Sequence, residues 1–147
     1  MIANKLGRKE ERSCMEERTF PAKAEAFTDV IQFLESALEI SDCPMKLTVP
    51  LTVAVEEMFI NIAHYAYPGS DGDMKLLIDA KPGEIFIRFT DSGIPFDPTA
   101  KPDPDVTLSV EERKIGGLGI YMAKRAVDSM KYEYKNGQNI LSLVKKY

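Results

Sequence analysis

The sequence lacks the features of secreted, metal-stabilised and membrane-spanning proteins. Its 147 residues include two cysteines, Cys14 and Cys43, which form neither a CxxC pair nor part of a histidine cluster. A disulfide between them is possible, but nothing in the sequence requires one, and reduced thiols fit a cytosolic chain. The polar start has no apolar signal-peptide segment, and no apolar run approaches the ~20 residues of a membrane span. These absences predict a cytoplasmic protein without a membrane partner.

An excess of positive charge is also absent. Lysine and arginine number 19 against 23 aspartates and glutamates, which gives a net charge of −4. A broad basic surface for nucleic acid is therefore not expected, and we predict no direct nucleic-acid partner. The hydrophobic content of 44% and the charged content of 29% are those of an ordinary globular protein. A chain of this length can form one domain with its own core.

The first residues lack a core-building pattern. Two interpretations are open: Met15 is the native start, or residues 1–15 are an N-terminal tail or extension. The folded domain is predicted over residues 16–147. The whole sequence contains no internal repeats or low-complexity tracts, so one domain is expected.

Apolar residues at helical spacing predict three helices. The first begins near Lys23, the second runs from about Pro50 to Tyr65, and the third follows Gly119 to about Ser129. Proline is acceptable in a first helical turn, which favours the start at Pro50.

Alternating patterns predict the strands, and a final hairpin turns at Asn136-Gly137. The predicted strands cover residues 16–20, 74–80, 85–90, 131–135 and 139–146. Helices beside such strands predict an α+β fold, a two-layer sandwich with the helices on one face of a mostly antiparallel mixed sheet.

The second helix carries the first chemical motif, Glu57 and Asn61. Residues four apart differ by about 40° around a helix, so the two share a face, predicted to lie opposite Met58 and Ile62. Glu56 lies about 140° from Asn61 and is the poorer partner. Alone, such a pair is more typical of a solvated helix face.

Two further motifs follow. The segment from Asp91 to Asp97, DSGIPFD, comes directly after a strand, where an aspartate followed by glycine permits a sharp turn and leaves its carboxylate available as an acceptor. The segment Gly116-Gly117-Leu118-Gly119 opens a helix, where backbone amides can approach an anion. Each is weak alone, since the first is consistent with a simple turn and the second with a flexible loop.

In this order and spacing, the three motifs resemble the N, G1 and G2 boxes of the GHKL (Bergerat-fold) ATPase superfamily, which includes gyrase, histidine kinases and MutL. The phrases DSGIPFDP and GGLGI resemble those of the branch of anti-sigma-factor serine/threonine kinases. The resemblance extends from about Glu17 to the C-terminus. It implies the Bergerat ATP-binding fold, with ATP and Mg²⁺ as ligands.

The resemblance also implies roles for single residues. Asn61 matches the asparagine that gives an oxygen to Mg²⁺ bridging the phosphates, and Glu57 matches the glutamate thought to act as general base. Asp91 matches the aspartate that accepts the adenine amine, and Gly93 lets the base pack closely.

The resemblance also implies which residues bind the phosphates. Gly117 and Gly119 match the glycines that cradle the phosphates, with Leu118 between them and Gly116 extending the turn. Residues 97–115 match the lid over the nucleotide. The lid arginine of the family is displaced here, which leaves Arg113 and Lys114 as the phosphate-binding candidates.

The sequence departs from the branch at two further positions. Tyr65 stands where the family often has a histidine, and His64 is one residue earlier, more typical of an exposed helix end than of a catalytic group. Asn139 occupies the region of a family threonine near adenine, and either Asn139 or a water molecule replaces it. These departures weaken the case for catalysis more than the case for binding.

The sequence is compatible with three functions. The leading one is an ATP-binding serine kinase and anti-sigma factor that acts by partner switching. It would phosphorylate a serine of a STAS-domain anti-anti-sigma protein and also bind a sigma factor, with a homodimer expected only by analogy. The alternative is a non-catalytic, nucleotide-gated protein-binding module of the same fold. A detached histidine-kinase domain is less favoured, because the sequence has no helix pair with an acceptor histidine.

Overall fold

Five strands form one sheet in the computed structural model, which describes residues 13–100 and 117–147. The strand order is β1-β2-β3-β5-β4, and every neighbouring pair in this part of the chain is antiparallel. The expected sheet was mostly antiparallel and mixed; the observed one is antiparallel throughout. The strands are β1 (Cys14–Pro21), β2 (Asp73–Lys81), β3 (Glu84–Asp91), β4 (Ser129–Lys135) and β5 (Gln138–Lys146).

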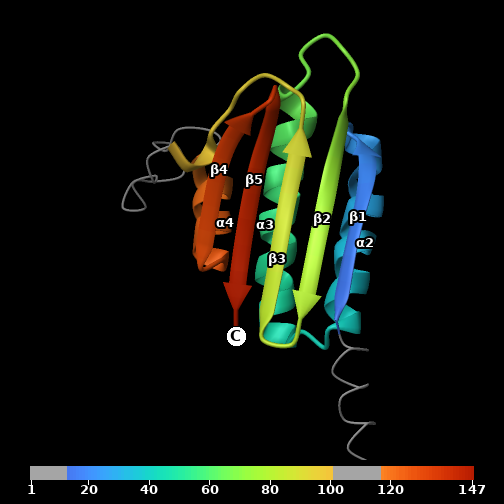
Figure 1. The fold of residues 1–147 in the computed structure, drawn as a ribbon, viewed down its shortest axis with the longest axis vertical. Helices are drawn as coiled ribbons and strands as arrows, with labels where there is room; N and C mark the ends of the chain where they lie inside the picture. Colours follow the sequence, from blue (N-terminus) through green and yellow to red (C-terminus); the bar gives the residue numbers. More distant parts are fainter. Residues whose placement is uncertain (1–12, 101–116) are drawn as a thin grey trace, which may run out of the picture.

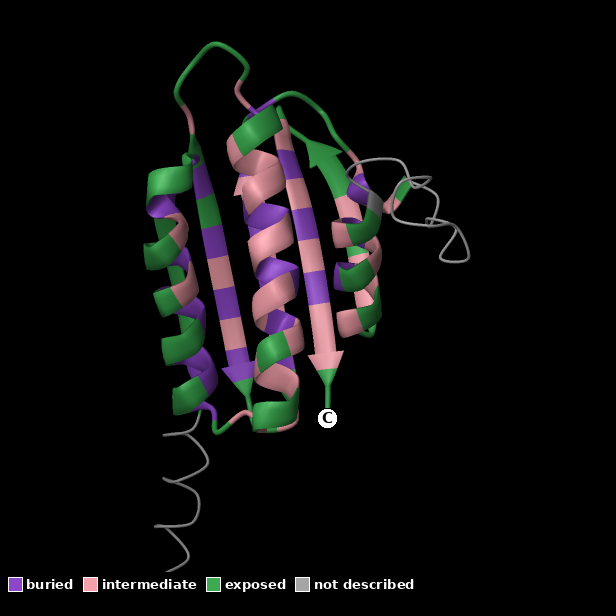
Figure 2. Ribbon diagram, turned by 180° about the vertical axis from the view of Figure 1, so that it is seen from behind, coloured by how far each residue is buried: buried purple, intermediate pink, exposed green. Residues whose placement is uncertain are grey.

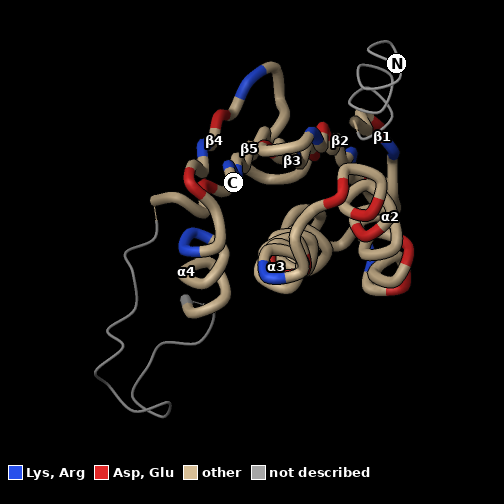
Figure 3. Tube along the Cα trace, turned by 90° about the horizontal axis from the view of Figure 1, so that it is seen from below, with Lys and Arg blue, Asp and Glu red and all other residues tan. Residues whose placement is uncertain are grey.

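All the described helices cover the same face of this sheet (Figures 1 and 3). They are α2 (Phe27–Ile40), α3 (Met45–Tyr65) and α4 (Gly117–Ala126), with short 3-10 turns η1 (Ala24–Ala26) and η2 (Pro98–Ala100). The two-layer α+β sandwich predicted from the sequence is therefore confirmed. None of the helices in residues 13–100 and 117–147 is long and apolar enough to cross a membrane.

The core lies between the two layers because the strands alternate. In β2 every second residue from Met74 to Ala80 is fully buried, and β3 repeats the pattern from Ile85 to Phe89. Each helix turns one buried stripe toward the sheet (Figure 2). Alternation of period two and stripes of period 3.6 thus meet in one hydrophobic core.

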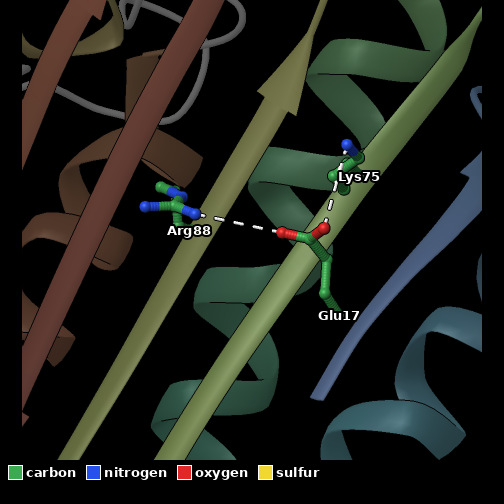
Figure 4. Close-up of polar contacts among 3 residues, drawn as sticks. All are labelled: Glu17, Lys75 and Arg88. Carbon is green, nitrogen blue, oxygen red and sulfur yellow. Dashed lines mark ion pairs between the residues drawn. The ribbon is translucent and has the colours of Figure 1, made fainter. Parts of the chain in front are cut away.

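Within the described part of the chain, no helix lies over the other face of the sheet, which carries charged side chains. Glu17 of β1 lies 3.8 Å from the Lys75 ammonium of β2 and 3.9 Å from the Arg88 guanidinium of β3 (Figure 4). The three side chains are 40–49% exposed, so each pair contributes at most about 1 kcal/mol. The pairs tie three neighbouring strands across the open face.

Helix α3 starts five residues before the predicted start at Pro50, which lies inside the helix. As the sixth helical residue, Pro50 removes only the hydrogen bond that its N–H would have made to the fourth residue before it. Around it, the Thr52 hydroxyl donates to the Thr48 carbonyl over 2.8 Å, and the Leu47 and Thr48 amides donate to the Pro44 carbonyl. The proline therefore does not mark the helix start.

Other boundaries differ by a few residues. Strand β1 begins at Cys14, so Cys14 and Met15, assigned to the expected extension, belong to the sheet. Helix α4 ends at Ala126, and Ser129 begins β4. The hairpin turn is as predicted, with positive φ at Asn136 (53°) and Gly137 (76°), the combination that a tight two-residue turn requires. Cys14 and Cys43 are free thiols.

Candidate functional site

A pocket lies where the C-terminal ends of α3 and β3 meet the start of β5. Apolar side chains form most of its wall, and its polar residues are Asn61, Tyr65, Asp91, Tyr132 and Asn139. Asn61 comes from α3 and Asp91 is the last residue of β3. Two residues singled out in separate sequence motifs therefore line one cavity. A mostly apolar pocket with a few convergent polar groups is the usual form of a ligand site.

Asp91 is held in the pocket by two hydrogen bonds to one of its carboxylate oxygens. Its side chain is buried at 6% exposure. The carboxylate oxygen Oδ1 accepts from the Gly93 amide and from the Asn139 side-chain nitrogen, both over 2.9 Å. Among the described residues, no hydrogen bond reaches the second oxygen, Oδ2. One oxygen is thus committed to the protein and the other is available to a donor in the pocket.

Gly93 allows the loop after β3 to rest on the end of α3. A Cβ at Gly93 would overlap the carbonyl oxygen and Cβ of Ala66. The next residue, Ile94, donates its amide to the same Ala66 carbonyl over 2.9 Å. Any side chain at position 93 would push the loop, and Asp91 with it, away from the helix.

Tyr67 holds the same loop from the other side. Its hydroxyl donates to the Asp73 carbonyl over 2.7 Å and accepts from the Ser92 amide over 2.8 Å. Burial raises the pKa of the Tyr67 phenol, so the hydroxyl keeps its proton at neutral pH. Gly72 lies against the Tyr67 ring and leaves no room for a Cβ. No sequence motif pointed to Tyr67.

Asn139, which the resemblance matched to the region of a family threonine, lies directly beside Asp91. It is the register partner of Asp91 across β3 and β5 and is buried at 7% exposure. Its nitrogen also donates to the Ile94 carbonyl over 3.0 Å, and its oxygen accepts from the Phe96 amide over 3.1 Å and from the Tyr132 hydroxyl. Burial raises the pKa of the Tyr132 phenol, which therefore stays a donor.

Glu57 lies outside the pocket lining, on the side of α3 that meets α4. A Cβ at Gly119 would overlap the Glu57 carboxylate, so helix and carboxylate are in direct contact. Asn61, one turn later, lines the pocket together with Met58 and Ile62. The prediction that Asn61 lies opposite these two residues was wrong, because residues 58 and 61 differ by only about 60° around a helix.

Part of the predicted phosphate end lies outside the described residues, namely Gly116, Arg113, Lys114 and residues 101–115 of the predicted lid. Gly117 is the first residue of α4, and Leu118 and Gly119 follow it. At the start of the predicted lid, Asp97 accepts from the Thr99 amide over 2.8 Å and Pro98 is buried in the pocket wall.

Comparison with protein families gives a match to the histidine kinase-like ATPase domain over residues 20–145. The chain belongs to this family. The family assignment agrees with the three motifs and with the sandwich fold.

Similar curated proteins in this family are protein kinases. The chain is 26% identical over 117 residues to the serine/threonine-protein kinase BtrW of Bordetella bronchiseptica, covering 79% of this chain and 82% of BtrW. It is 27% identical over 96 residues to the serine-protein kinase RsbW of Listeria monocytogenes. That match covers 62% of this chain and 61% of RsbW, so the aligned part spans less than two thirds of that relative.

Solved structures share the fold. The RsbU and RsbW domains of Rv1364c from Mycobacterium tuberculosis superpose with a TM-score of 0.61 and 15% identity, covering 90% of this chain and 32% of that one. A chain of the SiaB–SiaC complex from Pseudomonas aeruginosa gives 0.58 and 16%, covering 100% of this chain and 98% of that one.

His64 and Tyr65 are the last two residues of α3, the helix that carries Glu57 and Asn61. His64 is exposed, and its ring meets the Tyr65 ring edge-on at 6.0 Å. It lies beside an apolar groove with Phe27 and Phe59 rather than in the pocket with Asn61. Tyr65 lines the pocket. The geometry agrees with the expectation that His64 is an exposed helix-end residue.

Asn61 suits a magnesium ion that is bound mainly by the phosphates of a substrate and by water. Residues 13–100 and 117–147 contain no group of three or more His, Cys, Asp or Glu side chains placed to bind a metal. The half-buried Asn61 offers an amide oxygen, a hard ligand of the type Mg²⁺ accepts. Because Mg²⁺ is commonly held by one or two protein oxygens together with substrate phosphates and water, these residues fit the ion.

Proposed function

We propose that this protein is an ATP-dependent serine-protein kinase that acts by partner switching in the cytoplasm. Its substrate is a serine on a STAS-domain anti-anti-sigma protein, and a sigma factor is its second partner. A phosphoserine adds about two negative charges at such an interface, and like charge on a kinase with net charge −4 favours release. The domain that carries this activity comprises residues 16–147, extended by Cys14 and Met15 of β1.

One observation carries the proposal: Asn61 and Asp91, which come from separate motifs, line the same pocket. Asp91 has one oxygen free of hydrogen bonds from the described residues, ready to accept the exocyclic amine of adenine. Asn61, on the α3 side of the pocket, would hold Mg²⁺, which neutralises phosphate charge when bound. Gly117 and Gly119 at the start of α4 would approach the phosphates.

Glu57 would act as the general base. Its carboxylate would take the proton of the partner's serine hydroxyl as that oxygen bonds to the γ-phosphorus, while the bond from the phosphorus to the bridging oxygen breaks and ADP leaves. Glu57 lies one helical turn before Asn61 and touches Gly119. It is therefore next to the glycines proposed to hold the phosphates.

A second candidate is a nucleotide-gated binding module without phosphotransfer. One observation favours it: Glu57 is not part of the pocket lining and its carboxylate is packed against α4. In this case the same pocket would bind ATP or ADP and Glu57 would be dispensable.

The experiment that separates the two is transfer of labelled phosphate from ATP to a STAS-domain protein encoded beside this chain. Under the kinase proposal the label appears on serine in an acid-stable product, whereas a histidine kinase would give an acid-labile one. If ATP binds but no STAS protein is labelled, the binding module is the better account. If ATP does not bind, both proposals fail.

A further inference from the structure

The loop after β3 offers no free backbone donor to the pocket. The amide of each non-proline residue from Ser92 to Phe96 has an acceptor within the protein, and position 95 is a proline without an N–H. These acceptors are the Tyr67 hydroxyl for Ser92, Asp91 Oδ1 for Gly93, the Ala66 carbonyl for Ile94, and Asn139 Oδ1 for Phe96.

The side chain of Asn139 offers no free donor either. Its nitrogen faces three acceptors, Asp91 Oδ1 at 2.9 Å and the carbonyls of Gly93 at 3.3 Å and Ile94 at 3.0 Å, which use its two hydrogens. Its oxygen faces two donors, the Tyr132 hydroxyl and the Phe96 amide. Turning the amide over would set its oxygen against three acceptors and its nitrogen against the Phe96 amide, which can only donate. One orientation of Asn139 is therefore fixed.

We propose that Asn139 is a positioning residue that sets base specificity at this site, with Tyr132 fixing its orientation. Asn139 and the Gly93 amide both donate to Oδ1 of Asp91, so Oδ2 is the oxygen left for the ligand. Among the described residues, neither Asn139 nor the loop from Ser92 to Phe96 has a free donor beside it. This inference rests on the proposed nucleotide binding. A base with an exocyclic amine can donate to Oδ2, whereas a base with a carbonyl at that point would face a carboxylate with no hydrogen to share. Buried polar groups left unpaired in this way give strong discrimination.

The test compares ADP with inosine diphosphate, which replaces the exocyclic amine by a carbonyl. We expect the wild-type chain to bind ADP at least about 10-fold more tightly, the value of one hydrogen bond to a charged group. The informative variant is Asn139→Asp, which replaces the donor by a second carboxylate beside Asp91. Gln138→Glu is the matched control, because it adds the same charge one residue earlier on the opposite face of β5.

The variant has a pH signature that packing alone would not produce. Two carboxylates at hydrogen-bond distance share a proton at low pH and repel each other once both ionise. At pH 5.5 the shared proton takes the place of the hydrogen that the Asn139 amide donates in the wild type. At pH 8.5 the repulsion between the two carboxylates displaces Asp91. We expect the ratio of ADP to inosine diphosphate affinity in Asn139→Asp to fall at least about 10-fold over this range, relative to Gln138→Glu. The nearby titratable groups in the described chain are shared by all three proteins; they are Tyr65, Tyr67, Asp73, Asp97, Tyr132 and Tyr134.

A ratio in Asn139→Asp that equals the wild-type ratio at every pH overturns the inference while leaving nucleotide binding intact. An equal loss of affinity for both nucleotides also overturns it, because it indicates a purely structural role. If Asn139→Asp does not unfold cooperatively at pH 8.5, Tyr132→Phe decides the question. That variant removes one of the two donors to Asn139, so the ratio should fall about 3- to 10-fold, and an unchanged ratio contradicts the proposal. If the wild type binds neither nucleotide, the proposed function itself fails.

Discussion

The two ends of the proposed nucleotide site are held in different ways. At the base end, Asp91, Asn139 and the loop between Ser92 and Phe96 satisfy one another through hydrogen bonds. At the helix end, α4 rests on α3 through contact of Gly119 with the Glu57 side chain. A Cβ at Gly93 would meet the backbone of Ala66, whereas a Cβ at Gly119 would meet the flexible end of a glutamate. The base end is therefore fixed against backbone atoms, whereas the helix end rests on the tip of one side chain.

The largest effect is expected from a substitution that removes the proposed general base and leaves the base end unchanged. Glu57→Gln keeps the shape of the side chain and removes the basic site. Phosphotransfer to the STAS partner should fall about 10²- to 10⁴-fold, with ATP affinity close to wild type in calorimetry. Glu56→Gln is the matched control and should transfer at the wild-type rate. Transfer by Glu57→Gln at the wild-type rate would show that Glu57 is no base.

Asn61→Ala should lower both ATP affinity and phosphotransfer, because Mg²⁺ loses a protein oxygen. We expect the affinity for Mg·ATP to fall while the affinity for ATP in the presence of EDTA changes little. Calorimetric titrations with and without Mg²⁺ measure this difference. Equal losses in both conditions would contradict a role for Asn61 in holding the ion.

The next effect breaks the base end alone. Asp91→Asn removes the carboxylate that accepts the adenine amine and replaces one oxygen by a donor group. We expect adenine nucleotides to bind about 10- to 100-fold more weakly, the value of one hydrogen bond to a charged group. Asp79→Asn, on the open face of the sheet, is the control and should bind ADP normally. Unchanged ADP affinity in Asp91→Asn would place the base elsewhere.

Alanine substitutions at Gly93 and Gly119 compare the rigidity of the two ends directly. Gly93→Ala forces the loop away from Ala66 and should lower the free energy of unfolding by about 1–3 kcal/mol, as overpacking does. Gly119→Ala only displaces the Glu57 carboxylate, so urea unfolding should show a loss below about 1 kcal/mol together with slower phosphotransfer. Similar stability losses in the two variants would mean that the two ends are equally rigid.

The smallest effect lies outside the pocket, at the start of β4. The Lys146 amide donates to the Asp128 carboxylate over 2.6 Å and, with Lys145 nearby, lowers the pKa of Asp128. A lowered folded-state pKa stabilises the fold above the unfolded value of about 3.9, and this stability is lost as the pH falls through the folded value. The melting temperature of the wild type should exceed that of Asp128→Asn at pH 6, and the gap should close below pH 3. A constant gap would exclude this linkage.

Sequence patterns predicted the parts of the fold that depend on local order. Strand alternation and the Asn136-Gly137 turn are local signals, and the structure agrees with both. Pro50 misled the prediction of α3, because a proline six residues into a helix removes only one hydrogen bond.

The site depends on contacts that no local pattern contains. Asn139 and Asp91 are 48 residues apart and meet only because β3 pairs with β5 in a particular register. Tyr67 and Tyr132 act through hydroxyl groups whose partners depend on the loops around them. The motifs therefore pointed to Asn61 and Asp91, which line one pocket, but not to the residues that hold them in place.

The central claim is that the pocket between α3, β3 and β5 is an adenine nucleotide site, and a titration of the wild-type chain with Mg·ADP tests it most directly. Saturation to 100 times Kd stabilises a protein by about 2.7 kcal/mol, which corresponds to a rise in melting temperature of about 5 to 10 °C at this size. We predict such a rise for ADP and ATP, and a clearly smaller rise in Asp91→Asn at the same nucleotide concentration. No change in melting temperature with either nucleotide, at concentrations up to several millimolar, would contradict the account.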